Sequence, residues 1–173
     1  IFRMTRLIVI RARSTGTSLA LVRAALDRQL DVTVISGPND SLRGVFAAQV
    51  ELVNLETDAD VVVAWLRRHY PDPGRQLRVT TANDVYARLA AQVAETLGLP
   101  GPDTASVARS VSKAYQKSLL ATHDLPTSRF VVGALTDLPA LWGKLPLVRF
   151  PVVVKPSEGS ASHGVKLCRD FDQ

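Results

Sequence analysis

The sequence predicts an α/β fold whose opening part is a doubly wound parallel sheet. Residues 7–10 and 32–35 are short runs rich in Ile and Val, as expected of buried strands. Between them, apolar residues recur at helical spacing in the segment 18–29. A strand, a helix and a second strand in this order form a βαβ unit, which makes the two strands parallel with a right-handed crossover.

The alternation of strands and helices continues to residue 98. A third strand is expected within residues 49–55, and a capping box in residues 57–60 opens the next helix. A fourth strand is expected at residues 77–81 and a last helix at residues 84–97. The inner face of that helix is expected to carry Val85, Leu89, Val93 and Leu97. We therefore predict a Rossmann-like α/β domain over residues 1–98.

The remaining residues, 99–173, begin with a linker rich in Gly and Pro. Ser112 then opens a helix that ends before Pro126. A further strand is expected after that helix, in the stretch that ends at Val132. These residues form the start of a second unit.

The most distinctive segment is a strand, a loop of small residues and a second strand in residues 152–168. Lys155 directly follows the β-branched run of the first strand. The loop residues let the backbone approach a ligand closely, and glycine admits the positive φ values that aim N–H groups at one anion. They are Gly159, Ser160, Ala161, Ser162 and Gly164. The segment is neither a Walker A loop nor a GxGxxG loop, since its lysine precedes the loop. Taken alone, a plain hairpin that binds nothing explains these residues equally well.

Together with the helix at Ser112, this segment resembles the ATP-grasp superfamily. Its members carry a first phosphate-contacting lysine on a helix and a second at the end of a strand, before a mobile glycine-rich loop. Lys113 matches the first lysine and Lys155 the second. Only five of the 21 basic residues are lysines, so a match at both positions by chance is less expected. The resemblance implies that residues 1–98 are the domain that precedes the ATP-grasp domain. Residues 99–173 would be a linker and the incomplete start of the ATP-grasp domain.

Within the superfamily, the chain looks most like carboxylate–amine ligases such as bacterial L-amino-acid ligases and the ATP-grasp ligases of natural-product pathways. The resemblance implies that ATP phosphorylates a small-molecule carboxylate and that an amine attacks the acyl phosphate, giving an amide, ADP and phosphate. It also implies Mg²⁺, whose ligands are expected beyond residue 173, with none in this chain. We therefore expect a fragment that binds ATP weakly and has no ligase activity of its own. A homodimer through the first domain is expected by analogy.

Two other functions fit the same lysines. Biotin-dependent carboxylases use ATP to activate bicarbonate, but their phosphate loop tends to contain more glycine than residues 157–162. A binding module that kept the fold and lost catalysis is the non-enzymatic alternative.

Two loops of the first domain are candidates for substrate contact. Carboxyl ends of parallel strands form the crevice of doubly wound sheets, and a helix N-terminus with hydroxyl donors suits a carboxylate. The first loop carries Ser14, Thr15, Gly16 and Thr17, and the second carries Asn83 and Asp84. The competing interpretation is local capping, by Thr17 or Ser18 in the first loop and by Asn83 or Asp84 in the second. A single glycine in the first loop argues against bound NAD.

The composition excludes several other classes. The net charge is +5, but the basic residues are dispersed, so no nucleic-acid partner is expected. No apolar run is long enough for a membrane span, and no secretory signal opens the chain, so we expect a cytoplasmic protein. The single cysteine and the three histidines lack the spacing of a zinc site.

Overall fold

The computed structural model describes residues 5–40, 42–46, 48–134, 136–144, 149–159 and 162–170. The chain forms two compact units, within residues 1–107 and within residues 108–173. The predicted boundary between domains at residue 98 stays a prediction.

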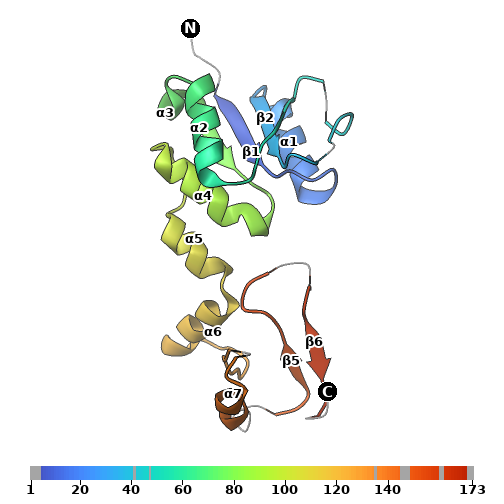
Figure 1. The fold of residues 1–173 in the computed structure, drawn as a ribbon, viewed down its shortest axis with the longest axis vertical. Coiled ribbons are helices and arrows are strands. Elements are labelled where there is room, and N and C mark those ends of the chain that lie inside the picture. Colours follow the sequence, from blue (N-terminus) through green and yellow to red (C-terminus); the bar gives the residue numbers. More distant parts are fainter. Residues whose placement is uncertain are drawn as a thin grey trace. The chain divides into compact units, whose positions relative to one another are not determined.

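The first unit is built on a four-stranded parallel sheet (Figure 1). Its strands are β1 (Arg6–Ile10), β2 (Asp31–Ser36), β3 (Glu51–Asn54) and β4 (Leu77–Thr80). The order is β3-β2-β1-β4, so β1 pairs with both β2 and β4. Each of the four strands predicted from the sequence is therefore present, and the parallel α/β fold is confirmed.

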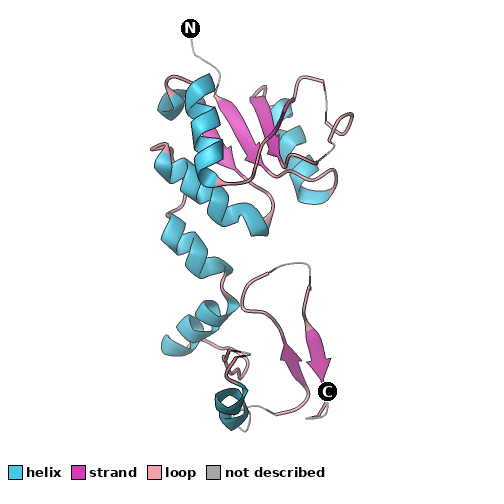
Figure 2. Ribbon diagram, in the orientation of Figure 1, coloured by secondary structure: helices cyan, strands magenta, loops and turns pink. Residues whose placement is uncertain are grey.

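Helices cover both faces of this sheet, because successive side chains of a strand point to opposite sides. On one face, Ile8 and Ile10 pack with α2 (Ala59–His69) and α4 (Ala87–Thr96). On the other face, Val9 packs with α1 (Gly16–Asp27). Figure 2 shows this arrangement of helices around the strands. The sheet is doubly wound, as the sequence predicts.

Two local expectations in this unit are wrong. The cap of α2 is Asp58 instead of Thr57, the first residue of the expected capping box, and the Asp58 carboxylate accepts hydrogen bonds from the amides of Asp60 and Val61 at 2.9 and 3.3 Å. A short helix, α3 (Pro73–Gln76), follows α2. Val85 is 57% exposed, because it lies in the separate 3₁₀ turn η1 (Asp84–Tyr86) before α4 begins.

The buried face of α4 consists mostly of small side chains, and Val85, which was expected on that face, lies outside the helix. Its fully buried side chains are Ala90, Ala91, Val93 and Ala94. Alanine side chains let a helix approach the sheet closely, and Val93 and Leu97 join the same core as predicted.

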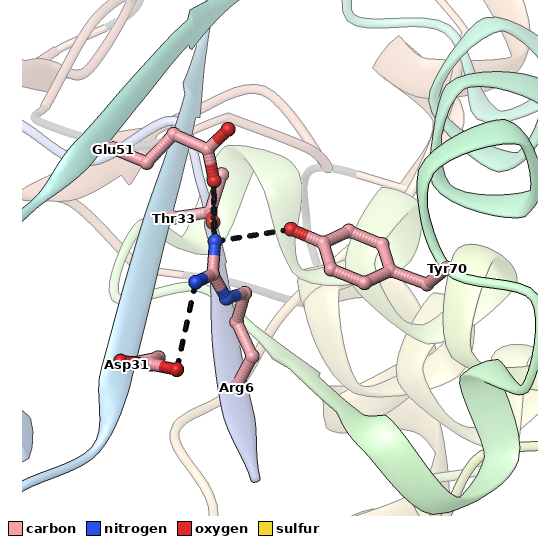
Figure 3. A network of polar contacts seen from close by, with 5 residues as sticks. All are labelled: Arg6, Asp31, Thr33, Glu51 and Tyr70. Atoms are coloured by element: carbon pink, nitrogen blue, oxygen red, sulfur yellow. Dashed lines mark hydrogen bonds and ion pairs between the residues drawn. The ribbon is translucent and has the colours of Figure 1, made fainter. Parts of the chain in front are cut away.

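A polar network ties the amino ends of three strands together (Figure 3). The Arg6 guanidinium donates to Glu51 Oε2 at 2.5 Å and to Tyr70 Oη at 3.2 Å, and it lies 3.5 Å from an Asp31 carboxylate oxygen. The buried Thr33 hydroxyl donates to the same Glu51 oxygen at 2.7 Å. Strand register explains this convergence, because Arg6 lies opposite Asp31 and Thr33 lies opposite Glu51.

The charge of Arg6 is stable in this setting. Burial lowers its pKa, whereas Tyr70, Glu51 and Asp31 raise it, and the net result is a pKa above the ordinary value. The raised pKa keeps the guanidinium protonated throughout the physiological pH range. The network lies at the sheet edge opposite the carboxyl ends of the strands, so we interpret it as structural.

The second unit contains α6 (Lys113–Thr122), α7 (Leu138–Lys144) and a hairpin of β5 (Val152–Val154) and β6 (Lys166–Cys168). A further helix, α5 (Thr104–Val111), spans the boundary between the units. The hairpin is antiparallel, with Val153 opposite Leu167, so the predicted strand–loop–strand is present. The strand predicted before residue 133 is wrong. Residues 129–132 have no strand partner within the described chain, and a strand forms only where its backbone groups are paired.

The second unit buries little apolar surface. Among its described residues, Cys168 is the one apolar side chain that is fully buried. The hairpin instead exposes Val153, Val154, Val165 and Leu167, each between 44% and 57%. A two-stranded hairpin without a covered apolar face is marginally stable in water.

We predict that Arg6→Leu lowers the free energy of unfolding of the first unit by about 2 kcal/mol, because it leaves the charges of Glu51 and Asp31 without their shared partner. Urea unfolding followed by circular dichroism measures this. Arg23→Leu is the matched control, since Arg23 is exposed and forms no ion pair with a described residue, and it is expected to change stability by less than about 0.5 kcal/mol. Equal effects of the two substitutions would contradict the prediction.

Hydrogen exchange should separate the two units. We expect the amides of β1 and β2 to exchange about 100-fold more slowly than those of β5 and β6, a difference of roughly 3 kcal/mol in opening free energy. The reason is that β1 lies between two strands and two helical layers, whereas the hairpin has exposed faces. Mass spectrometry of peptic fragments measures both sets in one sample. Similar protection in both sets would show that the hairpin has a stable core.

Candidate functional site

The start of α6 contacts the loop that follows Lys155. Ser112 caps the helix, since its Oγ accepts from the amide of Tyr115 at 3.3 Å. The Lys113 amide donates to the carbonyl of Ser157 at 2.9 Å, and the Lys113 ammonium donates to the carbonyl of Gly159 at 2.8 Å. The hydroxyl oxygens of Ser112 and Ser157 are 3.3 Å apart. Lys113 therefore lies against the small-residue loop, although the two are more than 40 positions apart in the sequence.

The loop needs glycine at two of its described positions. Gly159 has φ +122°, and Gly164 has φ +69°. A Cβ atom on Gly164 would also lie 2.9 Å from Cγ of Pro156. Ser162 adopts a left-handed conformation as well, with φ +59°, and its carbonyl accepts from the Val165 amide at 3.2 Å. Ser160 and Ala161 lie outside the described residues.

Lys155 directly follows β5 and is exposed. It forms no hydrogen bond or ion pair with any residue that the structure describes, and no interaction joins it to Lys113. Only one of the two predicted lysines is thus in contact with the loop in this conformation.

The Lys113 ammonium is suited to a negatively charged ligand. An ammonium has three N–H donors, of which the Gly159 carbonyl takes one. No described carboxylate pairs with Lys113. The residue is also the first of α6, where the helix dipole favours negative charge. These features together favour an oxyanion such as phosphate.

Sequence reasoning missed a second lysine on the same helix. The Lys117 ammonium donates to Thr127 Oγ1 at 2.8 Å and to Ser128 Oγ at 2.7 Å. Its position four residues after Lys113 puts both lysines on one helix face. That spacing was the signal that could have identified it.

At the carboxyl edge of the first unit, the loops after β1 and β4 lie next to each other. The Thr81 hydroxyl donates to the carbonyl of Ile10 at 2.8 Å, which joins them. The helix α1 begins at Gly16, with φ +66°, and its cap is Thr15 instead of the predicted Thr17 or Ser18. Thr15 makes no side-chain cap bond. The cap position moves upstream because glycine at residue 16 accepts the left-handed entry into the helix.

The hydroxyl groups of this first loop are available to a ligand. Ser14, Thr15 and Thr17 are exposed, and none of them hydrogen bonds to a described residue. In the second loop, Asn83 is a helix cap, as one interpretation predicts, since its Oδ1 accepts from the Val85 amide at 3.3 Å. Asp84 follows in the first turn of η1 and is exposed. A role for either loop in substrate contact stays a prediction.

A charged cluster at the same edge was also missed. The Arg11 guanidinium is 2.5 Å from Asp40 Oδ2 and lies over the Tyr86 ring, 4.9 Å from its centroid. The Asn54 amide donates to the carbonyl of Asp40 at 3.0 Å. A shallow cavity of about 240 Å³ adjoins the cluster and is lined by Asp40, Leu42, Arg43, Leu52 and Asn54. Arg11 directly follows β1 and Asn54 is the last residue of β3, and that position was the available signal.

The described residues contain no group of three His, Cys, Asp or Glu side chains placed to bind a metal ion. None of the described helices is long and apolar enough to cross a membrane.

No protein-family model matches the chain. A protein of Sinorhizobium fredii, known as the uncharacterized protein y4rH, is 32% identical over 92 residues, which are 53% of this chain and 19% of that protein. The chain therefore spans about a fifth of that relative.

Solved structures of ligases and carboxylases share the fold. An L-amino acid ligase from Bacillus licheniformis superposes with a TM-score of 0.75 at 23% identity, over 98% of this chain and 40% of that protein. The biotin carboxylase domain of 2-oxoglutarate carboxylase from Hydrogenobacter thermophilus, solved as a dimer with MgADP, ADP and bicarbonate, has a TM-score of 0.71 at 17% identity. The match covers 97% of this chain and 38% of that domain. The chain therefore has the fold of the amino-terminal portion of ATP-grasp enzymes, as its sequence predicts.

Proposed function

We propose that the chain is the amino-terminal part of an ATP-dependent carboxylate–amine ligase. The observation that carries this proposal is the hydrogen bond from the Lys113 ammonium to the Gly159 carbonyl. It joins the first lysine of the expected nucleotide site to the loop expected to cover the phosphates. The similarity in fold to an L-amino acid ligase supports the same assignment.

In the proposed reaction, a carboxylate oxygen attacks the γ-phosphorus of ATP and the bond from that phosphorus to ADP breaks. An amine nitrogen then attacks the acyl carbon, loses a proton, and displaces phosphate to form the amide. Negative charge accumulates on the phosphoryl oxygens during the first step, so positioned cations are the main requirement. Lys113, with two N–H donors left and the N-terminus of α6 behind it, meets that requirement.

The other predicted residues have supporting roles in this proposal. Lys155 would bring a second ammonium to the phosphates, and backbone groups of the loop from Gly159 to Gly164 would exclude water. The first unit would bind an organic substrate with the free hydroxyls of Ser14, Thr15 and Thr17 at the N-terminus of α1.

A biotin-carboxylase-like activity is the second candidate. The fold comparison favours it nearly as strongly, since the Hydrogenobacter thermophilus domain has a TM-score of 0.71. The loop composition argues against it, because residues 157–162 contain a single glycine. A module that binds nucleotide without catalysis is the third candidate.

We predict that Lys113→Met weakens ATP binding by the 173-residue chain about 10- to 100-fold, the effect of losing one or two hydrogen bonds from a charged donor. Titration of the ¹⁵N-labelled chain with ATP measures even millimolar dissociation constants. Lys144→Met is the matched control, since Lys144 also donates to a backbone carbonyl, that of Val132, at 3.2 Å. Equal affinities of the two variants would contradict the proposed site.

A substrate screen separates the three candidates. The longer protein that contains this chain is expected to release ADP only when a carboxylic acid and an amine are both present, and to form the amide in equal amount. ADP release with bicarbonate and biotin would favour the carboxylase, and ATP binding without turnover would favour the binding module. The 173-residue chain alone is expected to give no ADP in any of these mixtures.

A further inference from the structure

Lys117 is a charged residue that the proposed function does not use. It lies one helical turn after Lys113 on α6 and is half-buried. Its ammonium contacts two neutral hydroxyl oxygens, Thr127 Oγ1 at 2.8 Å and Ser128 Oγ at 2.7 Å. The contact joins α6 to the chain segment that leaves it.

No described acidic residue compensates the charge on this helix face. Neither Lys113 nor Lys117 forms an ion pair with a described residue. Residues 112–123 contain Lys113 and Lys117 and no Asp or Glu. Like charges four residues apart destabilise a helix, so this pair is unfavourable unless a ligand neutralises it.

The two hydroxyl groups are arranged as donors. Both oxygens accept from the Lys117 ammonium, so the hydroxyl protons of Thr127 and Ser128 point to other acceptors. The ammonium has a third N–H left. Lys117, Thr127 and Ser128 therefore offer three donors from neighbouring groups, and no described carboxylate pairs with the ammonium. An oxyanion binds to donors of this kind.

We propose that Lys117, Thr127 and Ser128 form a second phosphate-binding position, so that a polyphosphate lies along α6 from Lys113 to Lys117. Lys113 and Lys117 are four residues apart, which corresponds to a rise of about 6 Å along the helix axis. A chain of phosphoryl groups spans this distance better than a single phosphate does. This inference rests on the proposed function for the identity of the polyphosphate as the tail of ATP. The binding of a polyphosphate as such depends only on the charges and hydrogen-bond donors of α6 and of the chain segment after it.

The test uses sodium tripolyphosphate and ATP as probes of the ¹⁵N-labelled 173-residue chain. The side-chain Nζ signals of Lys113 and Lys117 are followed, together with the amides of Thr127 and Ser128. We expect all of them to shift with one dissociation constant. Lys117→Met is expected to weaken tripolyphosphate binding about tenfold and orthophosphate binding less, whereas Lys117→Arg retains most of the affinity.

Each outcome decides the matter. The inference fails if the Lys113 signals shift while those of Lys117 do not, or if Lys117→Met binds tripolyphosphate as well as Lys144→Met does. In either case Lys117 only holds the chain segment after α6, and the proposed function stands. If both lysines respond to tripolyphosphate but not to ATP, the second phosphate position stands and the proposed nucleotide site fails. If neither responds to either probe, both fail. The Nζ shifts of the unmodified chain answer the question even if a variant does not fold.

Discussion

The pairing of β1 with two parallel neighbours determines the architecture of the first unit. A central strand with β2 on one side and β4 on the other has no free edge, so its side chains must be covered from both faces. That requirement explains why Ile8 and Ile10 contact one pair of helices and Val9 contacts α1. It also brings the loops after β1 and β4 together, because parallel strands end at a common edge of the sheet.

The two ends of this sheet differ in their polar contacts. At the amino ends, the guanidinium of Arg6 contacts acidic and hydroxyl partners on β2, β3 and Tyr70. At the carboxyl ends, the hydroxyl groups of the first loop remain without a described partner. The carboxyl edge therefore holds both paired groups, such as Arg11 with Asp40, and exposed hydroxyl groups.

The sequence was sufficient for the parts of the fold that depend on local pattern. The strands of the first unit follow from runs of β-branched residues, and Ser112 was correctly expected to open the helix that ends before Pro126. The errors have physical causes. Val85 fits a helical pattern, yet a 3₁₀ turn rotates it into solvent. The stretch before residue 133 has strand composition, but pairing decides whether a strand forms, and pairing is not local.

The candidate site was only partly predictable for a similar reason. A strand followed by lysine and a small-residue loop is a sequence pattern, and it led to Lys155 and Gly159. The contacts of Lys117 and Arg11 depend on which segments return to them, at residues 127–128 and at Asp40. Residue type and spacing can suggest such partners, but only the folded chain selects one among many.

The hairpin of β5 and β6 has a practical consequence. Within the part of the chain that the structure describes, each of these strands pairs only with the other, so their outer edges carry backbone groups ready for another strand. The solvent-exposed valines add apolar surface near those edges, which favours association with another chain. Concentrated solutions of this chain should accordingly favour intermolecular β-ribbons, and dilution or a covering protein segment should suppress them.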